Sequence, residues 1–229
     1  IVQSLVGSEM CIRDRYGNIH ILCNNAGIGA NSGNKAIWEI EKQDWDWVMG
    51  VNYQGVLKGI QTFLPHMIEH GEEGHVLTTV SLAGLLPGAG TYGVSKHAVM
   101  ALAEALSRDL IARNTNINSS VLCPGFVDTN IDKSERNRPK GFGEAQEVKS
   151  EMGAEIMSAM LRQGKKPEEI AEIVFNSIKE NIFYILSHPA WDDSLRSHYE
   201  NILSRKEIRK NSEEEIAKFF SPREDGEKY

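Results

Sequence analysis

The chain has 229 residues, a formal net charge of -7 and a pI near 5.6, and 41% of its residues are hydrophobic. This length suits one domain, or a large part of one, with enough chain to bury a core. The acidic balance argues against a nucleic-acid partner, and the lack of an apolar run of about 18 residues argues against a membrane span.

Residues 1–15 are expected to be an artefactual leader and not native sequence. Residues 5–14 read LVGSEMCIRD, and a common transposon-type sequencing adapter encodes this stretch residue for residue. We therefore predict that native sequence begins at Tyr16, and the leader is left out of the fold prediction. The alternative is a short amphipathic helix at the N-terminus.

Strand-like apolar runs alternate with helical patterns from Tyr16 onward. The runs fall at residues 19–23, 75–80, 118–122 and 182–186, and the helical patterns at residues 44–69, 92–113, 167–180 and 192–204. Such alternation is typical of an α/β fold in which helices cover a parallel sheet. We predict one domain over residues 16–205, followed by a polar tail at residues 206–229 that frays.

The segment at residues 130–166 is expected to form an insertion, polar at first and then helical. Apolar residues recur in it at helical spacing, namely Met152, Ile156, Met157, Met160 and Leu161. Flexible thioether side chains suit a pocket for an apolar molecule, but the same stripe could simply pack on the core. Both interpretations stay open.

Thiol and metal chemistry receive little support from the sequence. Cys11, Cys23 and Cys123 form no Cys-x-x-Cys pair, which indicates a reducing compartment and a cytoplasmic location. Cys123 is interpreted as a small core residue and not as a nucleophile. Residues 66–70 read HMIEH, which fits the His-x-x-Glu-His pattern of one metallopeptidase class. Because no third ligand is evident, no metal is expected.

Tyr92 and Lys96 form a candidate proton-transfer pair. They lie four residues apart and so share one face of a helix. A free Tyr titrates near about pH 10, and the neighbouring ammonium is expected to lower the pKa of Tyr92. The phenol could then exchange a proton with an alcohol or ketone. Ser81, eleven residues upstream of Tyr92, is expected to hold the same oxygen.

Five short elements, taken in order, resemble those of the short-chain dehydrogenases/reductases. They are NNAG at residues 24–27, Asn52 in a helical pattern, Ser81 before Leu-Ala-Gly, the Tyr92 and Lys96 pair, and CPGFVDT at residues 123–129. A lone Tyr-x-x-x-Lys occurs by chance in many helices, whereas the ordered set is specific. The resemblance runs from Tyr16 to about Pro189 and implies a three-layer Rossmann-type fold.

The resemblance also implies an oxidoreductase that uses NAD or NADP to interconvert a secondary alcohol and a ketone by hydride transfer. Tyr92 would be the general acid or base, Ser81 would position the substrate oxygen, and Lys96 would tune Tyr92 and bind the nicotinamide ribose. Asn52 would complete a water-mediated proton relay. The alternative interpretation of Asn52 is a polar helix residue that hydrogen-bonds to the backbone. The alternative interpretation of Ser81 is a cap at the end of a strand.

Two further segments are implied to bind the cofactor together with Tyr92 and Lys96. The adenosine side would be lined by Asn24, Ala26 and Gly27, and the nicotinamide side by Pro124, Gly125, Val127 and Thr129. Plain turns remain the alternative for both segments. The partners implied are a small alcohol or ketone, possibly an apolar one, and further copies of the parent protein in a homodimer or tetramer.

Such proteins open with a strand, a Gly-rich turn and a helix that receives the pyrophosphate, and no such segment precedes Asn24. At about 30 residues per strand-helix-strand unit, roughly 60 residues are absent. We therefore predict a fold that lacks the first two or so strand-helix units, exposes a strand edge and is an inactive fragment. The choice between NAD and NADP depends on a residue in the absent part. The alternative is a catalytically silent binding or oligomer-forming paralogue.

Overall fold

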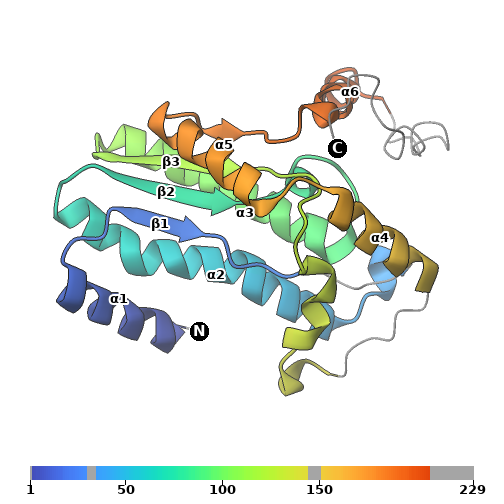
Figure 1. Cartoon of the computed structure of the whole chain (residues 1–229), viewed down its shortest axis with the longest axis horizontal. Helices are drawn as coiled ribbons and strands as arrows, with labels where there is room; N and C mark the ends of the chain where they lie inside the picture. The colour runs from blue at the N-terminus through green and yellow to red at the C-terminus, as the bar shows by residue number, and fades with distance from the viewer. Residues whose placement is uncertain (1, 30–34, 144–150, 207–229) are drawn as a thin grey trace.

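The computed structural model of the chain describes residues 2–29, 35–143 and 151–206. Within these residues, four parallel strands form one sheet in the order β1-β2-β3-β4 (Figure 1). The strands are β1 Ile21–Asn24, β2 Gly74–Thr79, β3 Ile117–Leu122 and β4 Tyr184–Ile185. They confirm the four predicted runs, although β4 covers only two residues of the run predicted at 182–186.

Six α-helices occur in the described part of the chain. They are α1 Val2–Tyr16, α2 Lys42–Glu69, α3 Gly90–Ala112, α4 Glu151–Gln163, α5 Pro167–Lys179 and α6 Asp192–Leu203. The start of α5 illustrates why they begin where they do. Pro167 stands where a missing N–H costs nothing, and the Glu169 carboxylate accepts a hydrogen bond from the Lys166 backbone N–H at 2.7 Å. None of the described helices is long and apolar enough to cross a membrane.

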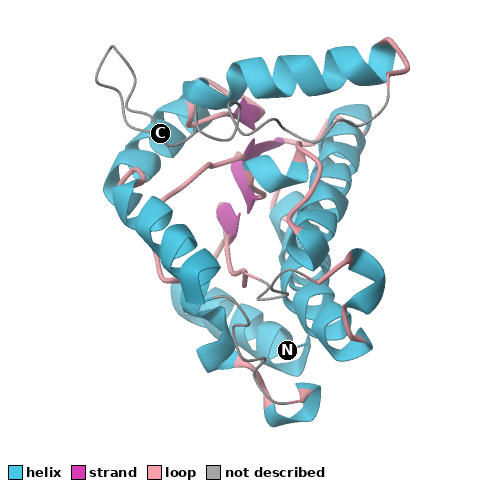
Figure 2. Cartoon of the chain, turned by 90° about the vertical axis from the view of Figure 1, so that its right-hand side faces the viewer, coloured by secondary structure: helices cyan, strands magenta, loops and turns pink. Residues whose placement is uncertain are grey.

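Helices cover both faces of the sheet, as predicted (Figure 1, Figure 2). Helices α2 and α3 pack side by side on one face, and α5 lies on the other. Neighbouring residues in a strand point to opposite faces, so Val76 joins the α2 and α3 core whereas Leu77 packs with Ile170 of α5. The result is the three-layer α/β arrangement with a parallel sheet.

Strand β1 is an edge strand with a partly uncovered face. Cys23 is in register with Leu77, so Ile21 and Cys23 point to the face that α5 covers farther along the sheet. Both are exposed, and Ile21 retains 59% of its accessible surface. No strand pairs with the far side of β1 within residues 2–29, 35–143 and 151–206. The predicted open edge is therefore present in the part of the chain that is described.

Helix α1 covers residues 2–15 of the predicted leader, together with Tyr16, and contacts α2. Within α1, Arg13 Nη1 donates a hydrogen bond to Glu9 Oε1 at 3.1 Å. The helical form agrees with the alternative interpretation of this segment, while its artefactual origin stays a prediction. Residues 207–229 of the tail that is predicted to fray lie outside the described residues.

Candidate active site

The candidate residues meet at the carboxyl ends of the parallel strands. Strand β1 ends at Asn24, Ser81 follows β2, and Pro124 follows β3. Helix α3 begins at the same edge and brings Tyr92 and Lys96 in its first two turns. In an open α/β sheet, ligands bind at this edge because the loops that leave the strands converge there. The topology therefore gathers residues that lie up to a hundred positions apart in sequence.

Asn52 is held by three hydrogen bonds in the core between α2 and the loop after β1. Its Oδ1 accepts from the Ile28 backbone N–H at 2.8 Å, and its Nδ2 donates to the Ile28 carbonyl at 3.0 Å and to Ser95 Oγ at 2.9 Å. Ser95 Oγ in turn donates to the Tyr92 carbonyl at 2.7 Å. Asn52 is fully buried, so its side chain locks the loop after β1 to the turn that carries Tyr92.

The phenol of Tyr92 shows a shift opposite to the one expected from the sequence. Burial raises the pKa of Tyr92, and a hydrogen bond with Ser81 opposes part of this rise. Lys96 Nζ lies 5.7 Å from the Tyr92 ring centroid. The net direction is upward and not downward, because the loss of water around the phenol outweighs the hydrogen bond with Ser81.

Lys96 is an almost fully buried cation. Its Nζ donates a hydrogen bond to the Thr79 carbonyl at the end of β2, at 3.0 Å. Burial lowers the pKa of Lys96 from 10.5 to about 8, and the nearby Cys123 raises it slightly. The ammonium thus remains mainly charged at neutral pH, and among the described residues one hydrogen-bond acceptor, the Thr79 carbonyl, contacts its three donors.

Gly27, in the loop after β1, lies close to Asn52 and Lys96. A Cβ at Gly27 would lie 3.4 Å from both Asn52 Oδ1 and Lys96 Nζ, so a side chain there would fill the approach to the ammonium. Asn24 is buried, and its Nδ2 has no hydrogen-bond partner. The Lys96 ammonium, next to a residue without a side chain, is a donor that fits a polar cofactor such as a dinucleotide, with its ribose hydroxyls as acceptors.

The segment after β3 is positioned by a histidine that the sequence analysis did not select. Gly125 N–H donates to His188 Nδ1 at 3.0 Å, and His188 Nε2 donates to the Phe126 carbonyl at 2.9 Å. Burial lowers the pKa of His188, which keeps the ring neutral so that one nitrogen can accept while the other donates. No local sequence pattern predicts this contact, because His188 lies after β4, far along the chain from Gly125.

The other predicted site residues occupy the same edge with fewer contacts. Val127 packs partly against the cluster under α5, Ala26 is exposed, and Thr129 is half-buried. Cys123 is fully buried, and burial raises the pKa of its thiol to about 12. A thiol with so high a pKa is a poor nucleophile, which supports the interpretation of Cys123 as a core residue.

The insertion is fixed against α2 by Arg138. Its guanidinium pairs with Asp44 Oδ1 at 2.7 Å and with both oxygens of Glu135, and it stacks 4.3 Å from the Trp47 ring centroid. Beyond this anchor, α4 lies at the carboxyl end of the sheet (Figure 1). Leu161 of α4 is buried, whereas Ile156 and Met157 keep nearly half of their surface exposed. Part of the predicted apolar stripe is therefore free to face a ligand.

Comparison with known proteins identifies relatives over most of the chain. Residues 9–140 match the family model for short chain dehydrogenases. The CLA biosynthesis dehydrogenase/reductase of Lactiplantibacillus plantarum is 32% identical over 198 residues, which are 83% of this chain and 68% of the relative. The C alpha-dehydrogenase of a Sphingobium species is 32% identical over 188 residues, 80% of this chain and 59% of the relative. The chain thus spans about three fifths to two thirds of these curated relatives.

Solved structures give the same result. A short chain dehydrogenase/reductase from Burkholderia phymatum, in complex with NAD, superposes with a TM-score of 0.86 at 36% identity, over 93% of this chain and 76% of that one. A putative short-chain dehydrogenase from Novosphingobium aromaticivorans has a TM-score of 0.70 at 28% identity, over 95% of this chain and 69% of that one. With the five ordered elements now assembled at one edge of a parallel sheet, this chain belongs to the short-chain dehydrogenase family.

Proposed function

We propose that the parent protein of this chain is an NAD- or NADP-dependent oxidoreductase that interconverts a secondary alcohol and a ketone. The observation that carries the proposal is the joint placement of Ser81, Tyr92 and Lys96 at the carboxyl edge of the sheet. The relatives named as dehydrogenases and reductases support it. So does the NAD complex of the Burkholderia phymatum relative.

The bound nicotinamide would supply or accept the hydride, and the chain supplies the proton and the orientation. In the direction of ketone reduction, Ser81 donates a hydrogen bond to the carbonyl oxygen and Tyr92 transfers its phenolic proton to the same oxygen. The Lys96 ammonium stabilises the phenolate that remains. Because burial raises its pKa, Tyr92 is protonated at neutral pH and can act as the proton donor.

Asn24, Gly27 and Lys96 are proposed to hold the adenosine and ribose side of the cofactor, with Ala26 in the same loop. Their support is the unpartnered Asn24 amide and the close approach of the Gly27 backbone to the Lys96 ammonium. The nicotinamide side is assigned to residues 124–129, because His188 braces the backbone of this segment. Asn52 is proposed to position Tyr92 through Ser95. This role replaces the one implied by the resemblance, in which Asn52 takes part in the proton relay itself.

The substrate is proposed to be an apolar alcohol or ketone. Ile156 and Met157 on α4 remain 45% and 46% exposed, on the insertion that Arg138 anchors beside the site. Exposed apolar side chains beside a catalytic edge favour an apolar ligand. A substrate panel that showed preference for small polar polyols alone would contradict this part of the proposal.

The 229-residue chain itself is proposed to be an inactive fragment. No Gly-rich turn joins a strand to a helix next to β1 in the described residues, so the pyrophosphate would lack its usual cradle of backbone N–H groups. We expect negligible NADH or NADPH oxidation by the purified chain with any carbonyl compound. Measurable turnover by this chain would refute the fragment interpretation but leave the oxidoreductase assignment standing.

The assignment itself is tested on the parent protein, recovered by a long read of the source DNA upstream of the Tyr16 codon. Tyr92→Phe is expected to lower kcat by roughly 10² to 10⁴ without loss of cofactor binding. Tyr199→Phe is the matched control, because Tyr199 is 47% exposed on α6 and is not one of the candidate site residues. A parent that binds no dinucleotide, or that is inactive with its Gly-rich turn intact, would favour the silent binding paralogue.

A further inference from the structure

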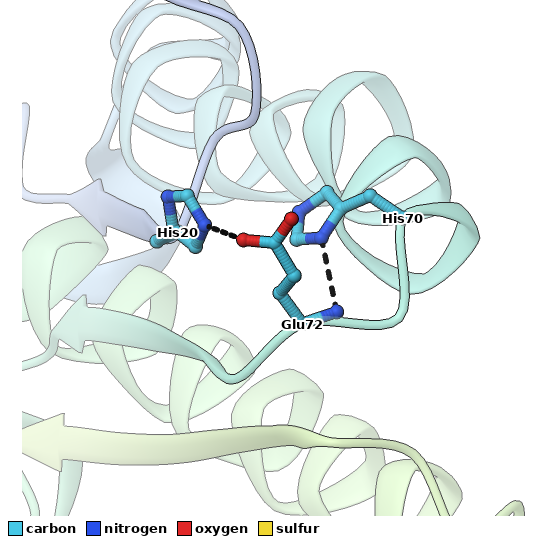
Figure 3. A group of neighbouring side chains, drawn as sticks. All are labelled: His20, His70 and Glu72. Atoms are coloured by element: carbon cyan, nitrogen blue, oxygen red, sulfur yellow. Dashed lines mark hydrogen bonds and ion pairs between the residues drawn. The ribbon is translucent and has the colours of Figure 1, made fainter.

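We propose that His20, His70 and Glu72 form a Zn²⁺ site at the amino-terminal edge of the sheet (Figure 3). Each residue offers one ligand atom, and these three atoms all lie within 4.8 Å of one another. Figure 3 shows the Glu72 carboxylate between the two imidazole rings. The cluster lies at the opposite end of the strands from Tyr92, so it is separate from the candidate active site.

The three ligands come from three elements that the fold holds firmly. His20 stands directly before β1, and its carbonyl accepts a hydrogen bond from His75 of β2 at 2.7 Å. His70 caps the C-terminus of α2, and Glu72 lies in the short connection from α2 to β2. Strand pairing and helix packing thus fix the backbone of all three, and rigid support is what a metal site requires.

Hydrogen bonds already orient the side chains. Glu72 Oε2 lies 2.7 Å from His20 Nε2, and Glu72 Oε1 accepts a hydrogen bond from Asn18 Nδ2 at 2.7 Å. The Glu72 carboxylate is therefore drawn toward His20, with an outer amide holding its second oxygen. Orientation of a ligating carboxylate by such outer hydrogen bonds is typical of protein metal sites.

The tautomer of His70 places the lone pair of the ring on Nδ1, because Nε2 donates its proton to the Ile19 carbonyl at 3.0 Å. This lone pair accepts a long bond of 3.2 Å from the Glu72 backbone N–H, and an ion on Nδ1 would replace that bond. A ligating His commonly donates its other ring N–H to a backbone carbonyl. His66 packs edge-on against His70 with 5.1 Å between ring centroids and limits rotation of the ring.

The donor set selects the kind of ion. Two imidazoles and one carboxylate match the three-ligand sites of Zn²⁺, which keep a fourth position for water. Mg²⁺ and Ca²⁺ prefer oxygen ligands and would gain little from the two rings. Because His20 and Glu72 are exposed, water can reach the fourth position. The ion would crosslink the segments that precede β1 and β2 to the C-terminal end of α2.

This set differs from the His-x-x-Glu-His pattern at residues 66–70. His66 is buried, and neither of its ring nitrogens has a hydrogen-bond partner. His70 belongs to both sets, but its proposed co-ligands come from before β1 and from beyond the end of α2. No local spacing in the sequence joins these residues, which is why the sequence predicts no metal.

The proposal is tested by equilibrium dialysis of the full chain against zinc chloride, with bound metal counted per chain. The chain is expected to bind one Zn²⁺, and His20→Ala and Glu72→Gln are expected to weaken binding at least about tenfold each. Glu73→Gln makes the same charge change at the adjacent exposed position, and His97→Ala removes an exposed imidazole on α3. Both controls are expected to bind as the unmodified chain does.

Thermal unfolding gives a second readout that does not depend on enzymatic activity. At a hundredfold excess of Zn²⁺ over the Kd of the unmodified chain, Tm is expected to rise by about 5 to 10 °C in the unmodified chain and in Glu73→Gln, and by no more than about half as much in Glu72→Gln. If His20→Ala fails to fold, Glu72→Gln decides the matter, because it exchanges one oxygen for nitrogen on an exposed side chain. Zinc binding that persists in both ligand variants, or an unmodified chain that binds none, overturns the proposal.

Discussion

Replacement of Lys96 by Met should change how the stability of the chain depends on pH. Lys96 is 4% exposed, and burial lowers its pKa from 10.5 to about 8. At about 1.4 kcal/mol for each pH unit, this difference corresponds to roughly 3 kcal/mol of unfavourable free energy near neutral pH. Met keeps an unbranched stem of similar length but carries no charge, so this penalty disappears in Lys96→Met.

The sign follows from proton binding in the two states. Between about pH 8 and pH 10.5 the unfolded chain keeps a proton on Lys96 that the folded chain has released, so the free energy of unfolding rises with pH. The penalty is complete below the folded pKa and absent above the unfolded pKa. Integration over about pH 7 to pH 9 gives a gain of roughly 1.3 kcal/mol in the unmodified chain relative to Lys96→Met.

Urea denaturation at several pH values between about 7 and 9 measures this difference. The range ends at about pH 9 because the pKa of Tyr92 and that of Cys123 are both raised by burial, and their unfolded-state ionisation adds an opposing slope at higher pH. Loss of the hydrogen bond to Thr79 moves the whole Lys96→Met curve but not its slope. Lys140→Met, at an exposed position, is the control. Parallel curves for the unmodified chain and Lys96→Met would refute the reasoning.

Three further predictions concern the contacts around the site. Arg138→Met should lower the free energy of unfolding by about 3 to 5 kcal/mol in urea, because the Asp44 carboxylate stays buried without its partner. Asn52→Ala should cost at least about 2 kcal/mol in the same assay, because the Ile28 N–H and carbonyl lose their partner. Because the folded pKa of His188 lies below its unfolded value of 6.5, the unmodified chain should lose more stability than His188→Gln on acidification below about pH 6.5.

The fold could be predicted because its signals are local. The run at residues 75–80 carries an apolar residue on each face of the strand, as a strand covered on both faces requires: Val76 and Leu77 are neighbours in sequence, yet they enter separate cores. Pro167 and the acidic residues after it mark the start of α5 in the same way. The length of β4 could not be predicted, because its end depends on how far the chain can pair with β3.

The site was predictable only for residues within recognisable motifs. Tyr92 and Lys96 share a helix, so their spacing alone places them together. Ser95 and His188 act through partners in other elements, Asn52 of α2 and Gly125 after β3, and only tertiary packing creates those contacts. The direction of the Tyr92 pKa shift was missed for a related reason. Sequence shows a nearby cation but not how much water the fold removes.

One part of the chain is held by internal hydrogen bonds, and another part, β1, is exposed. Each part could be the reason why the purified chain is inactive. Asn52 and His188 hold the turn that carries Tyr92 and the segment after β3 with partners inside the described chain, so this half should keep its geometry without a cofactor. The open part is β1, where Ile21 is exposed and the far edge has no paired strand in the described residues. An exposed edge promotes association with other chains. Absence of turnover by the purified chain, with an intact near-ultraviolet circular dichroism signal, would therefore indicate a defect in cofactor binding. Precipitation of the chain would instead indicate association through the exposed edge of β1.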